Sequence, residues 1–281
     1  MKNIIYLAII VALGLTSCDI IESNYEETSG PVEVDTAAKK VLLEEYTGFL
    51  CGHCPKAARE AHRLKEVYGD GLILMSIHAG SLALPNATHK ENYLSKAGNA
   101  IEKRWNVAWG VGTPNGMINR TVYGASNIIA PDNWETSIKS ELNKKADMKI
   151  DLAPAWSATF DKFDLEVKVK YLAKGDSTQK LAVFLLEDSV VGYQLDYYAT
   201  PNDVENYVHE SILRDAVTNV WGETIAEGAS IPVGAEITKN FSYTIPAGKT
   251  WRPAKLRLVA VVMNANNDYE ILQAEEIYVS K

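Results

Sequence analysis

The sequence predicts an α/β domain over residues 37–147, followed by an all-β, immunoglobulin-like sandwich over residues 148–281. In the first part, short apolar runs with strand propensity alternate with segments whose apolar side chains recur every three to four residues. From Met148 the period becomes two, and between Phe163 and Tyr171 apolar side chains alternate with charged ones. The 281 residues are 47 % apolar and 23 % charged, which is the composition of a folded protein.

Three segments set the order of the first domain. Val41–Thr47 is an apolar run, and Leu72–Ile77 is a continuous apolar run of the kind found in strands buried on both faces of a parallel sheet. Between them, Pro55–Tyr68 carries apolar side chains at helical spacing and ends at Gly69, which predicts a helix. We further expect a helix over Ser95–Trp105, a short strand within Val111–Arg120, and a helix that Asp132 caps and that ends near Asp147.

The second half contains short strands separated by turn residues. The strands are expected at Phe163–Tyr171, Leu181–Leu186, Phe241–Ile245, Leu256–Val262 and Ile271–Val279. Asn264–Asp268 supplies a hairpin loop between the last two. Tyr207–Trp221 fits either strand or a short helix. About seven strands with almost no helix predict a sandwich of two sheets.

The N-terminus has the features of an export signal. Lys2 precedes an apolar run, Ile4–Leu15, that is too short to span a bilayer comfortably, and the run leads into Leu-Thr-Ser-Cys18. This ending resembles a bacterial lipobox, so we expect residues 1–17 to be a signal peptide and Cys18 to be acylated. An ordinary secretory signal with a chance cysteine is the alternative. Residues 18–36 are polar and acidic and are expected to form a flexible tether.

The charge balance argues against one class of partner. The net charge is −8 and the sequence pI is about 5.3, so the chain lacks the basic surface that nucleic-acid binding requires. We therefore expect no nucleic-acid partner, and membrane contact only through the N-terminal lipid.

The cysteine count restricts disulfide pairing. The chain has three cysteines, and acylation of Cys18 leaves Cys51 and Cys54 as the only possible intramolecular pair. An oxidising compartment allows such a bond to persist. Because the loop that it closes is very short, it adds little stability through chain entropy, and a structural need explains it poorly.

The motif Cys51-Gly-His53-Cys54 lies between an expected strand and an expected helix. Pro55 is well tolerated in a first helical turn, so the thiols lie at a helix N-terminus, where the dipole and free N–H groups stabilise a thiolate. Protonated His53 would stabilise the Cys51 thiolate further. A metal site built from Cys51, Cys54 and His62 is a weaker alternative, because a fourth ligand is missing; we expect no metal.

This strand, motif and helix resemble the thioredoxin superfamily, and the Cys-Gly-His-Cys tetrapeptide is that of protein disulfide isomerases. The resemblance implies a thioredoxin-like domain with a buried carboxylate beneath the dithiol, at Glu45, which exchanges a proton with Cys54. Strand alternation alone leaves an exposed Glu45 possible, and it places Glu44 on the other face, where we expect it to be solvated.

The resemblance has a second part and two departures. Thr113-Pro114 resembles the superfamily's cis-proline turn, which holds the backbone of a bound peptide. Leu50 replaces the tryptophan that thioredoxins usually carry, and Pro55 replaces a lysine or arginine. These departures put the rate and the partner range in doubt, but not the redox chemistry. The motif implies an isomerase-type reduction potential of about −180 mV.

The whole mature chain resembles a family of lipoproteins named for outer membrane protein 28. The lipobox, the dithiol, the segment Thr113–Arg120 and the segment Leu213–Glu223 carry this resemblance. It implies a thioredoxin-like domain followed by a sandwich, and a lipid-anchored place in the cell envelope at the outer membrane. The periplasmic and the surface-exposed side of that membrane both remain open.

Together these features predict a membrane-anchored thiol–disulfide oxidoreductase. Cys51 would form a mixed disulfide with an exported protein and Cys54 would resolve it, with no cofactor besides the redox-active Cys51–Cys54 disulfide. Its partners would be thiol- or disulfide-containing envelope proteins and an external redox partner. The alternative is a non-catalytic outer-membrane or surface lipoprotein that acts as a binding or structural module through its β domain.

Overall fold

The structure is a computed structural model that describes residues 37–228 and 230–279. The predicted signal peptide, the acylation site Cys18 and the predicted tether lie outside the described residues. The described residues form one compact unit. Within the described part, no helix has the length and apolar character needed to cross a membrane.

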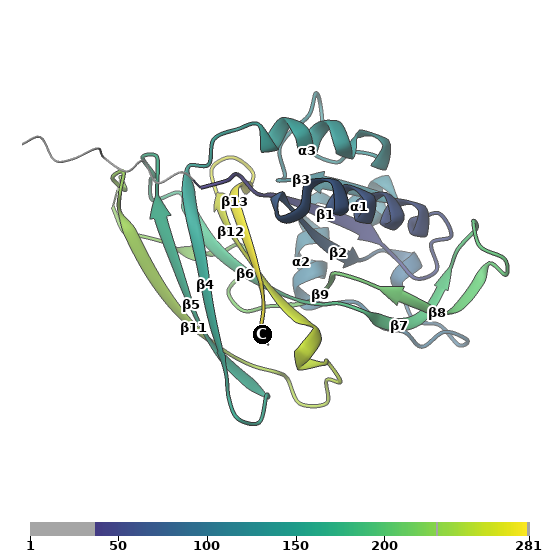
Figure 1. Cartoon of the computed structure of the whole chain (residues 1–281). Helices are drawn as coiled ribbons and strands as arrows, with labels where there is room; N and C mark the ends of the chain where they lie inside the picture. Colours follow the sequence, from purple (N-terminus) through teal and green to yellow (C-terminus); the bar gives the residue numbers. More distant parts are fainter. Residues whose placement is uncertain (1–36, 229, 280–281) are drawn as a thin grey trace, which may run out of the picture. The chain divides into compact units, whose positions relative to one another are not determined.

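The first half has the predicted order of elements (Figure 1). They are β1 (Val41–Thr47), α1 (Cys54–Tyr68), β2 (Leu72–His78), α2 (Lys96–Trp105), β3 (Asn115–Ile118) and α3 (Trp134–Leu142). β1 pairs in parallel with β2 and antiparallel with β3. Helices cover both faces of these strands, with α1 and α3 on one and α2 on the other. Double coverage explains why β1 and β2 are buried along their whole lengths.

The last helix of the first half differs from the prediction. Asp132 does not cap α3, because Pro131 starts a separate 3₁₀ turn, η4 (Pro131–Asn133), and the capping position falls to Asn133. Asn133 makes no side-chain cap hydrogen bond, and α3 ends at Leu142 rather than near Asp147.

The second half is built from strands, as predicted. They are β4 (Met148–Trp156), β5 (Lys162–Tyr171), β6 (Gln179–Glu187), β7 (Val190–Leu195), β8 (Asp203–His209), β9 (Ile212–Ala216), β10 (Glu223–Thr224), β11 (Glu236–Thr244), β12 (Leu256–Asn264) and β13 (Glu270–Tyr278). Within the ambiguous segment Tyr207–Trp221, the structure has the end of β8 and all of β9 and no helix, and bends and turns make up the rest. The loop Asn264–Asp268 joins β12 to β13 as expected.

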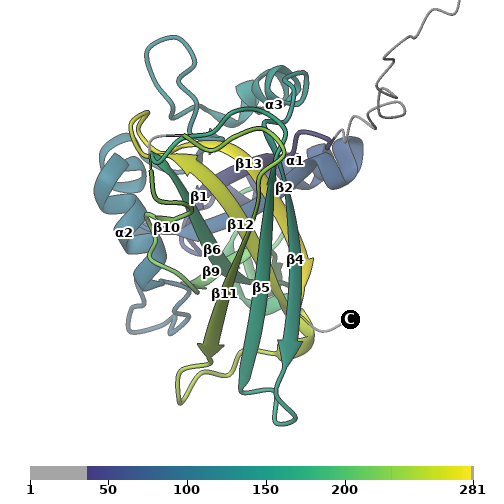
Figure 2. The ribbon, with the colours of Figure 1, turned by 90° about the vertical axis from the view of Figure 1, so that its left-hand side faces the viewer.

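One sheet runs through both halves of the chain. Its strand order is β13-β12-β6-β9-β2-β1-β3, with β10 added beside β6. The two halves meet where β9 pairs with β2 through Ser76 and Ile212. A separate sheet, β11-β5-β4, lies over the β6–β12 part, as Figure 2 shows, and β7 and β8 form a hairpin of their own.

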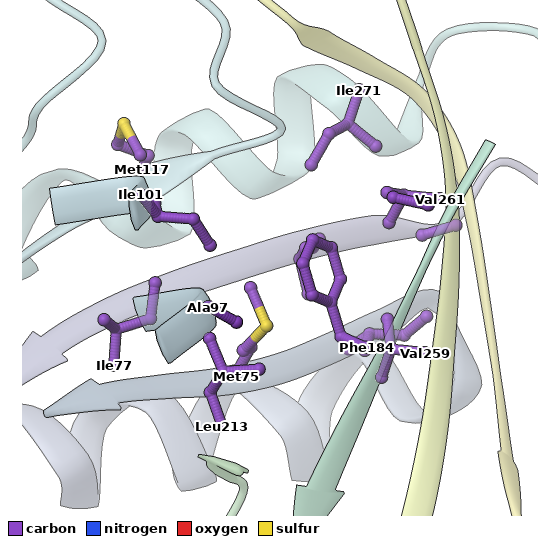
Figure 3. Packing of buried hydrophobic residues seen from close by; sticks show 14 of the residues in the cluster. Met75, Ile77, Ala97, Ile101, Met117, Phe184, Leu213, Val259, Val261 and Ile271 are labelled. Carbon is purple, nitrogen blue, oxygen red and sulfur yellow. The ribbon is translucent and has the colours of Figure 1, made fainter. Parts of the chain in front are cut away.

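β6 and β12 are buried on both faces. Leu181, Val183 and Leu185 pack against β5 and the rest of the three-stranded sheet. The alternate residues of β6, including Phe184, face β1, β2 and α2. Figure 3 shows Phe184 and Val259 on the same side as Met75 of β2. This shared packing fixes the second half against the layer that carries the two cysteines.

Candidate functional site

Cys51 and Cys54 form a disulfide at the start of α1. Both residues are buried, with 3 % and 1 % of their surfaces exposed. The loop before the helix is held by two backbone hydrogen bonds, from Cys51 N to Gly48 O (3.0 Å) and from Cys54 N to Cys51 O (3.1 Å). Pro55 lies in the first helical turn, as its missing N–H allows. The structure therefore places the pair where the sequence predicted, at a helix N-terminus.

Glu45 lies inside the protein, close to this pair. Its side chain comes from β1 and lines, together with Cys54, a cavity of about 30 Å³ on the α1 side of the strand. A space of this size holds about one water molecule. Oε1 has no hydrogen-bond partner among the described residues, and Oε2 has only a weak one, the Ser76 hydroxyl at 3.5 Å.

Burial controls the protonation of Glu45. It raises the pKa of the carboxyl to about 8, against a smaller opposing effect of the Ser76 hydroxyl, which lowers the pKa. The carboxyl is consequently protonated in most molecules at neutral pH and titrates close to that pH. A group of this kind can give a proton to a neighbouring sulfur or take one from it.

Glu44 corrects one expectation. It points to the opposite face of β1, as alternation required, but it is fully buried rather than solvated. Its two carboxylate oxygens accept hydrogen bonds from Arg120 Nε (2.8 Å) and Nη2 (2.7 Å). Because α2 and the second half of the chain cover that face, a charge on it needs a buried partner.

Thr113 and Pro114 lie between η3 (Val107–Val111) and β3, and the peptide bond that joins them is cis. Pro114 lines an open groove of about 620 Å³ next to the start of α1. His53, Lys56 and Tyr198 line the same groove. A polypeptide segment lying there would run beside the cysteine pair.

His53 lies on the surface between the two cysteines. Its Nδ1 is 3.0 Å from the hydroxyl of Tyr198, and its ring packs edge-on against Tyr197 at 5.1 Å between centroids. Both tyrosines belong to the turn between β7 and β8. The histidine expected to act on Cys51 is thus held by residues from the second half of the chain.

The tip of the β7–β8 hairpin, from Gln194 at the end of β7 through the turn to Tyr198, is the part of the site that sequence reasoning missed. Gln194 Nε2 donates to the carbonyl of Cys51 (3.2 Å), and Tyr197 N donates to the carbonyl of Gly52 (2.9 Å). Gln194 and Cys51 are 143 positions apart, and no spacing rule links them. The only available signal was the pair of adjacent tyrosines in a polar turn.

The remaining histidines surround the site without forming a metal centre. His78 and His209 are buried neighbours whose pKa values are lowered by burial, that of His209 to about 4. His209 also hydrogen-bonds the carbonyl of Tyr193, and His89 stacks on the Tyr193 ring. His62 borders the Glu45 cavity. Among the described residues, no group of three or more typical ligand residues could hold a metal ion.

A family model described as outer membrane protein Omp28 matches residues 98–281. The chain belongs to the Omp28 family. This membership confirms the predicted place at the outer membrane of the cell envelope. The matched residues include Thr113, Pro114 and the β7–β8 turn, but neither Cys51 nor Cys54. No curated protein matches the chain.

Solved structures support the fold. HBP35 of Porphyromonas gingivalis is similar with a TM-score of 0.60 and 17 % identity, over 87 % of this chain and 76 % of that one. Protein AGR_C_4864 from Agrobacterium tumefaciens has a TM-score of 0.54 and 13 % identity, over 87 % and 96 %. A domain of the outer membrane lipoprotein Omp28 from Porphyromonas gingivalis matches with a TM-score of 0.32 and 19 % identity, over 48 % and 88 %. At these identities the first two likenesses concern the fold alone.

Proposed function

We propose that this Omp28-family protein is a thiol–disulfide oxidoreductase of the outer membrane whose first half is a thioredoxin-like domain. The observation that carries the proposal is the Glu45 carboxyl, which is buried, lacks a partner at Oε1 within the described residues and lines the same cavity as Cys54. An unpaired buried carboxyl costs stability, so a structural role explains it poorly. Perturbed carboxyls beside a reactive group are typical of proton-transfer sites.

The reaction follows from these positions. In the reduced protein, the Cys51 thiolate attacks a substrate disulfide; a mixed disulfide forms and one substrate sulfur leaves as a thiolate, which takes a proton from solvent. Glu45, in its carboxylate form, removes the proton from Cys54 through the cavity, and the Cys54 thiolate attacks Cys51. The second substrate thiol leaves and the Cys51–Cys54 disulfide closes, so two electrons have passed to the substrate.

The groove gives the substrate a place to lie. It runs past His53 and is bordered by Pro114 and Tyr198, so a segment bound there lies next to the cysteine pair. Each turnover leaves the protein oxidised, and an external dithiol must reduce it again; with an external disulfide oxidant, the same steps run in reverse. We further propose that acylation of Cys18 tethers the protein to the membrane.

Trapping tests this function. In the mature protein, Cys54→Ala should accumulate mixed disulfides on Cys51 in the cell envelope, whereas Cys51→Ala should trap none. The wild type should reduce a model protein disulfide when supplied with a dithiol. Absence of trapped partners, combined with absence of disulfide reduction, would sink this proposal.

A second candidate is a binding module whose disulfide is inert. Two observations favour it: the Omp28 match covers residues 98–281 without the cysteines, and the β7–β8 turn covers the disulfide. The reduction potential separates the candidates. A value below about −300 mV would mark a bond that no envelope partner reduces, while a value near −180 mV supports exchange.

A further inference from the structure

We propose that the tip of the β7–β8 hairpin, residues 194–198, is a displaceable cap on the dithiol, and that an extended polypeptide segment displaces it by donating its own backbone N–H groups. The proposal rests on the function proposed above and specifies the class of partner.

The cap is held by the main chain of the cysteine loop. Leu195 N donates to Phe49 O (2.8 Å) and Tyr197 N donates to Gly52 O (2.9 Å). Between these two bonds, the Gln194 side-chain amide donates to Cys51 O (3.2 Å). All three bonds run in one direction, from the cap to carbonyl oxygens of the loop around Cys51.

Side chains close the cap further. The Tyr197 ring lies directly on Gly52, where a Cβ atom would come within 2.6 Å of three ring atoms. Asp196 accepts from Arg59 Nη1 of α1 (2.8 Å). Gly52 is therefore the residue type that the closed cap needs at this position.

The cap has the features of a segment that opens locally. β7 and β8 pair with each other and with no other described strand, and an isolated two-stranded hairpin is marginally stable. Tyr197 and Tyr198 remain about half exposed, at 53 % and 54 %. The base of the hairpin is anchored, because Tyr193 is buried against Phe49. Opening would then affect the turn and leave the base in place.

The bonds of the cap indicate what replaces it. An opened cap removes the donors to the carbonyls of Phe49 and Gly52 and one of the two donors to the Cys51 carbonyl, which keeps its bond from Cys54 N. The hydrogen bonds lost on opening favour a replacement that supplies the same donors. Leu195 and Tyr197 are two residues apart, which is the spacing at which an extended strand presents its N–H groups to one side. A polypeptide can supply this pattern, and a small thiol cannot.

Reduction kinetics test the cap in the oxidised mature protein. Dithiothreitol reduces the Cys51–Cys54 disulfide to two thiols and is itself oxidised to its cyclic disulfide. Tyr197→Ala should be reduced about tenfold faster than the wild type, equivalent to about 1.4 kcal/mol less closing free energy. Gly52→Ala should be reduced faster as well, because its Cβ pushes the ring away. The matched control is Phe160→Ala, an exposed aromatic in the β4–β5 turn. Equal rates for the wild type, both cap variants and the control would overturn the cap.

A synthetic peptide tests the partner class. The probe has the sequence of residues 194–200, and a second version is N-methylated at the positions of Leu195 and Tyr197. The first peptide should slow dithiothreitol reduction of the Tyr197→Ala protein back toward the wild-type rate, and the second should not. Equal effects, or no effect of either peptide, would overturn the partner class. Faster reduction of the cap variants without any exchange with protein disulfides would leave the cap standing and remove the oxidoreductase function.

Discussion

The two faces of β1 treat neighbouring carboxyl groups in opposite ways. On one face Glu44 is fully buried and holds Arg120 through two short hydrogen bonds. On the other face Glu45 is equally enclosed, but one of its oxygens has no partner among the described residues and the other has a weak one. Both side chains are buried, but they differ in how many of their carboxylate oxygens have a close hydrogen-bond donor among the described residues. The comparison separates a carboxylate that organises the fold from a carboxyl that is free to exchange a proton.

The Glu44–Arg120 pair joins distant parts of the chain. Arg120 follows β3, and its guanidinium also contacts the Trp105 ring, with 4.8 Å from Cζ to the ring centroid, and the sulfur of Met263 in β12. One buried cation thus links β1, α2 and the second half. Glu45, by contrast, faces the small cavity beside Cys54, and its Oε2 accepts a weak hydrogen bond from the Ser76 hydroxyl.

The largest expected effect is on stability. Arg120→Ala leaves the Glu44 charge buried and unpaired, and we expect a loss of about 3–5 kcal/mol in the free energy of unfolding, measured by urea denaturation. The control is Arg63→Ala, which removes exposed ion pairs with Glu60 and Glu135 and should cost less than about 1 kcal/mol. Equal losses in the two variants would show that the Glu44 pair does not organise the fold.

The next effect concerns chemistry. Glu45→Gln keeps the size of the side chain but removes the proton acceptor, so resolution of the mixed disulfide by Cys54 should slow about a hundredfold at neutral pH. Stopped-flow decay of a mixed disulfide with a model peptide measures this step. Glu44→Gln is the matched control on the other face, and its folded protein should resolve the mixed disulfide at the wild-type rate. A similar slowing in both variants would contradict a special role for Glu45.

The sequence predicted one side of this comparison better than the other. The resemblance to the thioredoxin superfamily implied a buried Glu45, and alternation placed Glu44 on the opposite face. What covers that face was not predictable, because alternation assigns side chains to faces and says nothing of distant partners; Arg120 lies 76 positions away. The Tyr197 contact with Gly52 was missed for the same reason.

The fold shows the same limit. Apolar periodicity predicted the helices of the first half and five of the ten strands described in the second half, namely β5, β6, β11, β12 and β13. It did not predict that β9 would join the two halves into one sheet, since a strand's pattern does not name its neighbours. At that junction β9 pairs in parallel with β2 through Ile212 and Ser76. β6 and β12 are buried on both faces, and their sequences do not identify the elements that cover them.

A third, smaller effect is a pH dependence of stability. The pKa of Glu45 is about 8 in the folded protein against 4.5 as its ordinary value. Between these values the unfolded state has lost the proton that the folded state keeps, so the stabilisation present at low pH is lost as pH rises toward 8, by up to about 1.4 kcal/mol per pH unit. The lowered pKa of His209, from 6.5 to about 4, acts in the opposite direction below pH 6.5.

The measurement therefore compares two proteins. Free energies of unfolding of the wild type and Glu45→Gln are taken by urea denaturation from pH 6.5 to 9. The wild-type value should fall relative to that of Glu45→Gln as pH rises to about 8, and the difference between the two should be constant above that pH. Parallel curves across this range would show that Glu45 titrates normally in the folded protein.

The smallest expected effect concerns the Ser76 hydroxyl, which donates a weak hydrogen bond to Glu45 Oε2. The Ser76 hydroxyl lowers the Glu45 pKa, so Ser76→Ala should raise that pKa further and change the free energy of unfolding by less than about 1 kcal/mol. Infrared titration of the carboxyl band in the wild type and the variant measures the shift.

Ser95→Ala is the matched serine control. Its hydroxyl accepts from Gly98 N (2.9 Å) as the N-cap of α2, so the variant should lose about 1 kcal/mol of stability and leave the Glu45 pKa unchanged. If Ser76→Ala behaved like Ser95→Ala, costing stability without moving the carboxyl, the Ser76 hydroxyl would serve the packing of β2. Glu45 would then have no effective partner within the described residues, and its contrast with Glu44 would be sharper still.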